Sequence, residues 1–210
     1  MDDAKAALDA AIAALETKPT PAPTPTPTHV CPGAKFTDMP ALDNWAHKPI
    51  DWAIVNGITA GTSDTTFGPD EGCTRAQVVT FLWRAAKQPE PKTTSNPFTD
   101  VKEGDYFYKA VLWAVENGIT KGTSDTEFSP ADTCTRGQIV TFLYRYEGEP
   151  KVDATESAFS DVKTTDYFFA PIAWAVENEI TQGIGDGKFG PNDTCTRAQV
   201  VTFLYRDIAE

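Results

Sequence analysis

The residues best suited to binding chemistry are three arginines, each following a threonine at equivalent positions of a repeat: Arg75, Arg136 and Arg197. A guanidinium group presents a planar fork of N–H donors that matches carboxylate or phosphate oxygens. Each arginine is predicted at the first position of a helix, where positive charge opposes the helix macrodipole at a cost of roughly 0.3–1 kcal/mol. A bound anion would offset this cost, because free helix amides and the guanidinium group converge on one point. The alternative is a salt bridge to a nearby acid such as Asp70 or Glu71, but the acids differ between the copies and the arginine does not.

Three further sets of residues lie near these arginines in the sequence and could wall a binding groove. They are loop glycines, loop aspartates and aromatic residues on which a sugar face could stack, namely Gly61, Gly122, Gly183, Asp64, Asp125, Asp186, Trp45, Tyr106 and Tyr167. The alternative is structural: glycines and aspartates serve turns, and the aromatic rings are partly buried. Core packing is the favoured interpretation for the inner tryptophans, which are Trp52, Trp113 and Trp174.

The sequence does not favour catalysis or a metal site. It has no repeated Ser/His/Asp or Cys/His constellation, and neither of its 2 histidines is shared among the copies. The 30 acidic residues are scattered as on a solvated surface, and the loop GTSDTTFGPDEG lacks the ligand spacing of a calcium loop. There is no CxxC pair, and His29 and His47 are not spaced as zinc ligands. We therefore expect no enzyme activity, no metal and no cofactor.

Three of the 4 cysteines, Cys73, Cys134 and Cys195, occupy equivalent positions, while Cys31 precedes the first copy. We expect the equivalent cysteines to act as small buried apolar residues. The alternative is a disulfide between Cys31 and Cys73 if the chain is extracellular.

The charge of the chain limits its partners. A net charge of -12 and an isoelectric point near 4.6 oppose encounter with nucleic acid or an anionic membrane surface. No apolar run approaches the roughly 18–20 residues that span a bilayer. The hydrophobic share of 40%, with 11% aromatic residues, is sufficient for a packed core.

The arginines belong to a repeat with a period of 61 residues, seen in Trp52, Trp113 and Trp174 and in many other residues from Phe36 onward. Each copy is predicted to be a helix, an irregular loop and a second helix. The first helix covers about residues 46–56, and Ile50, Ala53 and Ile54 share one face. Pro49 and Pro171 fit only its first turn. Gly57 and Gly118 are expected to end this helix, whereas Glu179 at the third position predicts a corner that closes differently or with some strain.

The second helix begins with a capping box, Thr74 with Gln77, and this pair recurs as Thr135 with Gln138 and Thr196 with Gln199. Its apolar stripe cannot be buried by a single copy. We therefore expect a mainly α fold in which three copies close around an approximate threefold axis.

The predicted domains are a short amphipathic helix at 1–17, a Pro/Thr-rich linker at 18–35, and three repeats at 36–91, 92–152 and 153–210. The alternating prolines of KPTPAPTPTPT hold the linker backbone extended.

The repeats resemble S-layer homology domains. The similarity lies in the openings FTDM, FTDV and FSDV, the helix ends NGIT, NGIT and NEIT, and the signatures TRAQ, TRGQ and TRAQ. It covers Phe36 to about Ala209. The resemblance implies a three-repeat pseudo-trimer with ligand grooves between adjacent copies. It also implies that the signature arginines bind the carboxylate of a secondary cell-wall polysaccharide of Gram-positive bacteria, often a pyruvylated sugar.

We therefore expect a secreted, noncovalent cell-surface anchoring module that is monomeric when isolated. The alternative is a structural module that assembles into an S-layer or binds another protein without sugar. The sequence departs from the family signature, because glutamine replaces its glutamate in every copy. Gly137 replaces alanine in the second copy and Glu179 replaces glycine in the third, so the grooves need not be equally active.

Overall fold

The structure, a computed structural model, describes residues 31–209. The predicted helix at 1–17 and the predicted linker as far as residue 30 lie outside this range. The helices are α2 His47–Val55, α3 Arg75–Ala85, α4 Tyr108–Glu116, α5 Arg136–Tyr146, α6 Phe169–Glu177 and α7 Arg197–Ile208, preceded by the short 3-10 helix η1 Pro32–Lys35. Within residues 31–209 the only β pairing consists of isolated bridges. The predicted mainly α class is therefore confirmed.

The short helix η1 lies within the predicted linker at 18–35. It occupies the last part of the predicted linker, its Gly33 is buried, and it packs against α2. The Gly33 amide donates to Oδ1 of Asp51 at 2.8 Å. This buried contact joins η1 to the first helix of the first copy.

The first helices of the repeats, α2, α4 and α6, are the outer helices of the molecule. Each has 9 residues, and the bounds repeat at the 61-residue period. Pro49 and Pro171 lie in the first turn, as predicted, where no helical amide bond is lost. On the predicted apolar face, Ile50 and Ala53 are fully buried, and Ile54 is partly buried against the core.

The outer helices end with the same backbone turn in all three copies. Gly57 and Gly118 have φ of 68° and 70°, and Glu179 adopts nearly the same conformation with φ of 59°. The Glu179 amide donates to the carbonyl of Val176 at 3.1 Å, as Gly57 does to Ile54 at 3.0 Å. Left-handed backbone costs a non-glycine residue about 1–2 kcal/mol. The strain predicted for the third copy is therefore present.

The second helices of the repeats, α3, α5 and α7, are the inner helices. Each begins with a complete capping box, in which the threonine hydroxyl accepts from the glutamine amide and the glutamine side chain accepts from the threonine amide. These boxes confirm the prediction at all three positions. The signature arginine is the first residue of each inner helix, also as predicted.

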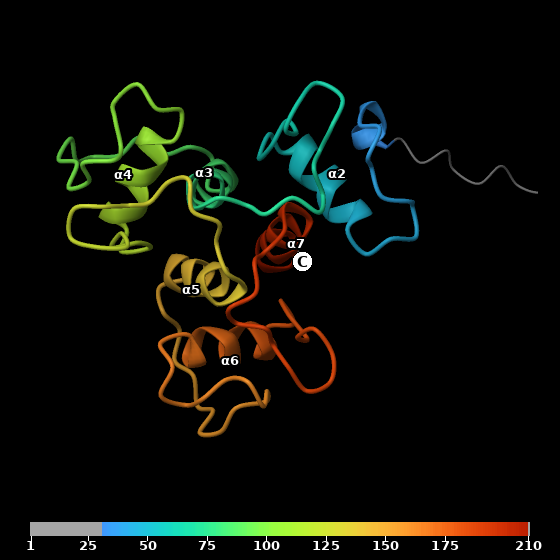
Figure 1. Ribbon diagram of the computed structural model, residues 1–210, viewed down its shortest axis with the longest axis vertical. Coiled ribbons are helices and arrows are strands. Elements are labelled where there is room, and N and C mark those ends of the chain that lie inside the picture. The colour runs from blue at the N-terminus through green and yellow to red at the C-terminus, as the bar shows by residue number, and fades with distance from the viewer. Residues whose placement is uncertain (1–30, 210) are drawn as a thin grey trace, which may run out of the picture. The chain divides into compact units, whose positions relative to one another are not determined.

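The inner helices gather at the centre of the molecule, and the outer helices surround them in three lobes (Figure 1). Helix α4 packs on α3, α6 on α5, and α2 on α7, while α7 also contacts both other inner helices. Each outer helix thus covers the inner helix of the preceding copy, and the first copy covers the last. This packing of each copy on its neighbour joins the three copies into a closed ring and confirms the predicted threefold arrangement.

The three equivalent cysteines lie where the copies meet and are fully buried. Their backbones form a cyclic set of hydrogen bonds: the amide of Cys73 donates to Cys195 at 3.0 Å, that of Cys134 to Cys73 at 2.9 Å, and that of Cys195 to Cys134 at 2.9 Å. We call these three residues the central ring. Burial raises the pKa of the Cys73 and Cys134 thiols to about 12. All three are free thiols, so the Cys31–Cys73 disulfide is not formed in the described structure.

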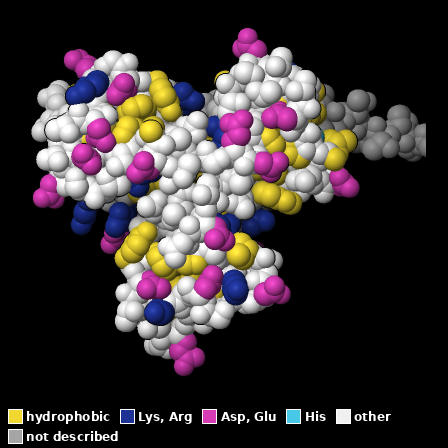
Figure 2. Space-filling view, in the orientation of Figure 1, with side chains coloured by type: hydrophobic (Ala, Val, Ile, Leu, Met, Phe, Trp, Pro, Cys, Tyr) yellow, Lys and Arg dark blue, Asp and Glu magenta, His cyan; other side chains and the backbone are white. Residues whose placement is uncertain are grey.

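Acidic side chains are scattered over all three lobes on the face shown in Figure 2, as expected from the composition. Among residues 31–209, no helix has the length and apolar character that crossing a membrane requires.

Candidate functional site

The three signature arginines are buried at the junctions between copies. Their exposed fractions are 4%, 4% and 2% for Arg75, Arg136 and Arg197. Each Nε donates to a backbone carbonyl of the next copy around the ring, with partners Phe128 at 2.8 Å, Phe189 at 2.9 Å and Phe67 at 2.9 Å respectively. Each arginine therefore joins its own copy to the next one by a hydrogen bond.

Each guanidinium group also lies between two phenylalanine rings. The Arg136 carbon Cζ is 4.8 Å from the centroid of Phe189 and 5.4 Å from that of Phe203. The same pairs recur for Arg75 with Phe128 and Phe142, and for Arg197 with Phe67 and Phe81. Ring faces attract a cation and hold its plane in place. The guanidinium groups are thus pre-oriented before any ligand arrives.

The helix amides do not take part in an anion site, which corrects the sequence analysis. The first amide of each inner helix donates to a loop carbonyl of the next copy: Arg75 to Asp132 at 2.8 Å, Arg136 to Asp193 at 3.0 Å and Arg197 to Glu71 at 2.9 Å. The second amide donates to Pro130, Pro191 or Pro69 in the same way. These carbonyl dipoles satisfy the helix start. These helix amides are therefore not available to an anion.

The predicted alternative, a salt bridge to Asp70 or Glu71, is wrong. Within the described part of the chain, none of the three arginines forms an ion pair. Burial lowers the pKa of each guanidinium, and nearby thiols and carboxyl groups partly oppose this shift. An arginine nevertheless remains protonated in proteins. Each guanidinium keeps a positive charge that no carboxylate neutralises by direct contact.

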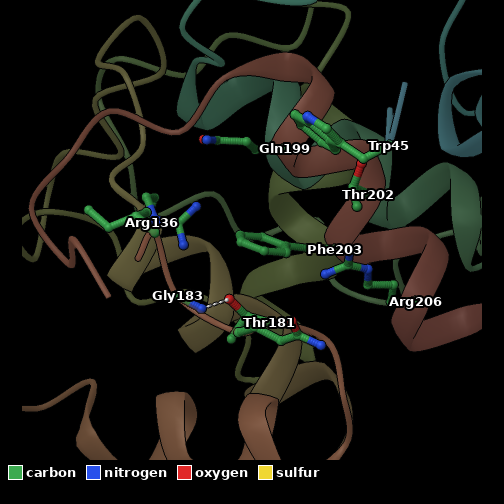
Figure 3. Close-up of a pocket in the computed structure, with 10 residues that line it drawn as sticks. Trp45, Arg136, Thr181, Gly183, Gln199, Thr202, Phe203 and Arg206 are labelled. Atoms are coloured by element: carbon green, nitrogen blue, oxygen red, sulfur yellow. Dashed lines mark hydrogen bonds between the residues drawn. The ribbon is translucent and has the colours of Figure 1, made fainter. Parts of the chain in front are cut away.

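A groove of about 400 Å³ opens beside Arg136, and we call it the Arg136 groove. Helix α7 contributes Phe203 and Arg206, the loop before it contributes Gly183 and Ile184, and the first copy contributes Trp45 (Figure 3). The Gly183 amide donates to the Thr181 hydroxyl at 3.2 Å, which fixes the loop backbone at this wall. Three copies of the repeat therefore build one groove.

The equivalent groove beside Arg75 has a volume of about 200 Å³, and we call it the Arg75 groove. Its wall includes Lys121 and Gly122 of the second copy, Arg145 of α5, and Tyr167 of the third copy. The Nη2 atom of Arg75 is buried and has no hydrogen-bond acceptor within residues 31–209.

The third arginine differs from Arg75 at the same atom. Nη2 of Arg197 donates to the hydroxyl of Thr59 at 3.2 Å, which satisfies this donor. The three junctions thus share a backbone arrangement but differ in the hydrogen bonds left for a ligand.

The predicted glycines occupy turns that only glycine fits, and two of them also line grooves. Gly61 has φ of 100°, and a Cβ there would lie 2.5 Å from the carbonyl oxygen of Thr66. Gly122 and Gly183 have φ of 83° and 85° and would meet similar obstacles. The structural and functional interpretations are therefore compatible at these positions.

The predicted aspartates lie outside the two grooves, whereas two of the three predicted aromatic residues line them. Asp64, Asp125 and Asp186 are exposed, and they are absent from the walls of the two grooves. Trp45, Tyr106 and Tyr167 are 55%, 62% and 63% exposed, so they are not core residues. Trp45 and Tyr167 line a groove built mainly by other copies, which places them where a ligand could stack.

The inner tryptophans pack in the core, as predicted. Trp113 and Trp174 are 6% and 5% exposed, and Trp52 is partly buried against the same core. Trp52 also makes an edge contact with Tyr205 of α7, with ring centroids 5.5 Å apart. His47, which we assigned to no zinc site, is buried with Nδ1 2.7 Å from the Pro40 carbonyl and Nε2 3.4 Å from Asp51.

The sequence analysis missed a set of aspartates that hold the groove loops: Asp38, Asp100 and Asp161. Each carboxylate accepts two successive backbone amides of the loop, as Asp161 does from Phe189 at 2.9 Å and Gly190 at 2.8 Å. These bonds fix the phenylalanine whose carbonyl receives the arginine. The repeated FxD opening was the available signal, but it does not reveal a partner 28 residues away.

The repeated geometry agrees with the family comparison. A model of the S-layer homology domain matches residues 35–79, 97–140 and 158–201, and the chain belongs to this family. Each matched segment contains one signature arginine.

Similar proteins include an amylopullulanase of Thermoanaerobacterium thermosulfurigenes, 31% identical over 78% of this chain and 9% of that protein. A cell surface protein of Thermoanaerobacter kivui is 35% identical over 53% of this chain and 15% of that protein. The S-layer protein EA1 of Bacillus anthracis is 28% identical over 82% of this chain and 20% of that protein. The chain thus spans at most a fifth of the length of these relatives. Membership of this family of Gram-positive surface proteins places the chain at the extracellular cell surface.

Proposed function

We propose that this chain anchors a protein noncovalently to the cell wall by binding an anionic secondary cell-wall polysaccharide. The ligand group is a sugar carboxylate, such as that of a pyruvylated sugar. The chain itself acts as a monomer and catalyses no reaction.

The single observation that supports this proposal is the state of the signature arginines. Three positive charges are held rigidly at junctions without a carboxylate partner, although the chain has a net charge of -12. A buried charge without a partner is costly, so its retention favours a ligand that supplies the negative charge. Clefts lined by one sign of charge concentrate ligands of the opposite sign.

The aromatic residues at the groove walls support a sugar rather than a small inorganic anion. Trp45 and Tyr167 each offer an exposed ring beside an arginine of another copy. A ring face and a cation in one groove suit a ligand with an apolar face and an acidic group.

The test is pelleting of the intact chain with purified cell walls. Removing the buried arginines would disturb the junctions, so the better variant is the triple change Trp45→Ala, Tyr106→Ala and Tyr167→Ala at exposed positions. We expect at least a tenfold loss of wall affinity with an unchanged thermal unfolding midpoint. Val55→Ala is a control, because Val55 is 69% exposed and lines neither groove.

Walls stripped of their secondary polymer should not pellet the unmodified chain. Undiminished pelleting with stripped walls would contradict the proposal and favour the structural alternative, in which the repeats bind protein. That alternative also predicts concentration-dependent oligomers in sedimentation experiments without polysaccharide.

A further inference from the structure

The wall position next to the groove glycine differs in every copy, although its surroundings repeat. It is occupied by Ala60, Lys121 and Gln182, each directly before Gly61, Gly122 or Gly183. Lys121 lines the Arg75 groove and Gln182 lines the Arg136 groove. At this position the Arg75 groove therefore carries a full positive charge, and the Arg136 groove carries a neutral amide.

The Arg75 groove is the more cationic of the two. It is lined by Arg75, Lys121 and Arg145, whereas the Arg136 groove is lined by Arg136 and Arg206, and no acidic side chain lines either. One of these charges is partly balanced, because Nε of Arg145 lies 3.8 Å from the exposed carboxylate of Glu149. Lys121 forms no ion pair with a carboxylate among residues 31–209, so its charge remains available to a ligand.

The arginine of this groove also has a buried donor atom without an acceptor among residues 31–209. Arg75 is 4% exposed, and its Nη2 donor has no acceptor, unlike Nη2 of Arg197. The nearby Cys134 thiol supplies no negative charge, since burial raises its pKa to about 12. A buried donor of this kind without an acceptor is uncommon and favours an acceptor from outside the chain.

The Arg136 groove is larger and more apolar. Trp45 and Ile184 line it and are 55% and 50% exposed. Position 184 is threonine in the other two copies, as Thr62 and Thr123. The Arg136 groove therefore offers a ligand apolar contact surface, whereas the Arg75 groove offers it positive charge.

We propose that the Arg75 groove is a specialised subsite for a sugar carrying a doubly charged anion such as a phosphate monoester, and that Lys121 selects this ligand. The Arg136 groove takes a singly charged acidic sugar with an apolar face. This inference rests on the proposed function and assigns different ligand groups to its grooves. The polymer that fits both has two kinds of acidic residue.

The experiment uses the intact chain and two sugars of different charge, glucose 6-phosphate and glucuronate. Binding is followed by NMR at the backbone amides of Gly122 and Gly183, which report the Arg75 and Arg136 grooves separately. We expect glucose 6-phosphate to saturate Gly122 at a concentration about fivefold lower than Gly183, the ratio expected of one additional partly exposed charge contact. Glucuronate should show no such preference for Gly122.

Reciprocal variants test the role of Lys121. Lys121→Gln should remove the fivefold preference, and Gln182→Lys should create it at Gly183. Lys163→Gln is the matched control, because it removes one positive charge from the chain without changing either groove wall.

Equal saturation of both glycines by glucose 6-phosphate, or no effect of Lys121→Gln, would overturn this inference. The proposed function would survive that result if wall pelleting still required the secondary polymer. No response of either glycine to either sugar, together with pelleting by stripped walls, would overturn both.

Discussion

The central ring and the groove walls contain equivalent positions of the same repeats, yet one is uniform and the other varies. At the ring, every copy has a cysteine, and the cyclic amide bonds are 2.9–3.0 Å long. At the walls, Lys121 and Tyr167 of the Arg75 groove correspond to Gln182 and Trp45 of the Arg136 groove.

The two regions differ in whether their polar groups are buried and must form hydrogen bonds within the protein. The ring and the arginine junctions join copies through backbone amides and carbonyls that are buried and must be paired. The wall side chains that differ between copies, such as Lys121 and Trp45, face solvent, where substitutions change stability little. The wall positions can therefore vary with the ligand while the junctions hold the fold.

The largest effect is expected from breaking a junction, with Phe128→Ala. The Phe128 ring is fully buried beneath the guanidinium of Arg75 and packs on Phe98. Its removal should lower the free energy of unfolding by about 3–5 kcal/mol, as measured by urea denaturation.

Tyr167→Ala is the comparison on the groove wall. Tyr167 is 63% exposed, so its loss should change the unfolding free energy by less than about 1 kcal/mol while weakening sugar binding. Equal destabilisation by both variants would show that the two regions do not differ as described.

A smaller effect is expected where a junction loop is held by a carboxylate, with Asp161→Asn. Burial opposes ionisation of Asp161, but bonds from the Phe189 and Gly190 amides outweigh it, so the pKa lies below its ordinary value. A carboxyl group whose pKa is lower in the folded chain stabilises the fold at pH values above its pKa in the unfolded chain, which is near 4. This stabilisation is lost as the pH falls through the pKa in the folded chain. The variant should lose about 1–2 kcal/mol at pH 7.

The pH dependence of the unfolding free energy tests whether the effect of Asp161→Asn comes from the lost negative charge. Between the unmodified chain and Asp161→Asn, the difference in unfolding free energy should shrink as the pH falls below about 4. A difference that is constant from pH 7 to pH 3 would exclude the ionised carboxylate as its cause.

The last stability effect concerns the ends of the outer helices, where the third copy carries Glu179 in place of a glycine. Glu179→Gly should raise the unfolding free energy by about 1 kcal/mol, because it removes the strain of left-handed backbone. Gly118→Ala is the reciprocal change; its Cβ would meet nothing within 4 Å, so any loss reports backbone strain alone. A destabilised Glu179→Gly would indicate a contact of this glutamate that outweighs the strain.

Most of the local structure could be predicted from the sequence. The capping pair Thr135 and Gln138 announced the start of α5, and Pro49, Gly57 and Glu179 marked the ends of outer helices. These signals act within a few residues, so the repeat period carried each prediction to all three copies.

The site was less predictable because its partners come from different copies. The first amides of α3 were expected to be free, but they donate hydrogen bonds to the carbonyls of Asp132 and Pro130. The role of Asp161 was missed because its amide partners lie in the loop before α7. Neither fact can be read from one copy alone.

The sequence by itself determined the repeat, the helix boundaries, the position of each arginine at a helix start and the family. Only the tertiary structure decided that Arg136 points into a groove built by α7 and walled by Trp45 of the first copy. The physical reason is ring closure: hydrogen bonds and apolar contacts between copies form only when the outer helix of each copy packs on the inner helix of its neighbour.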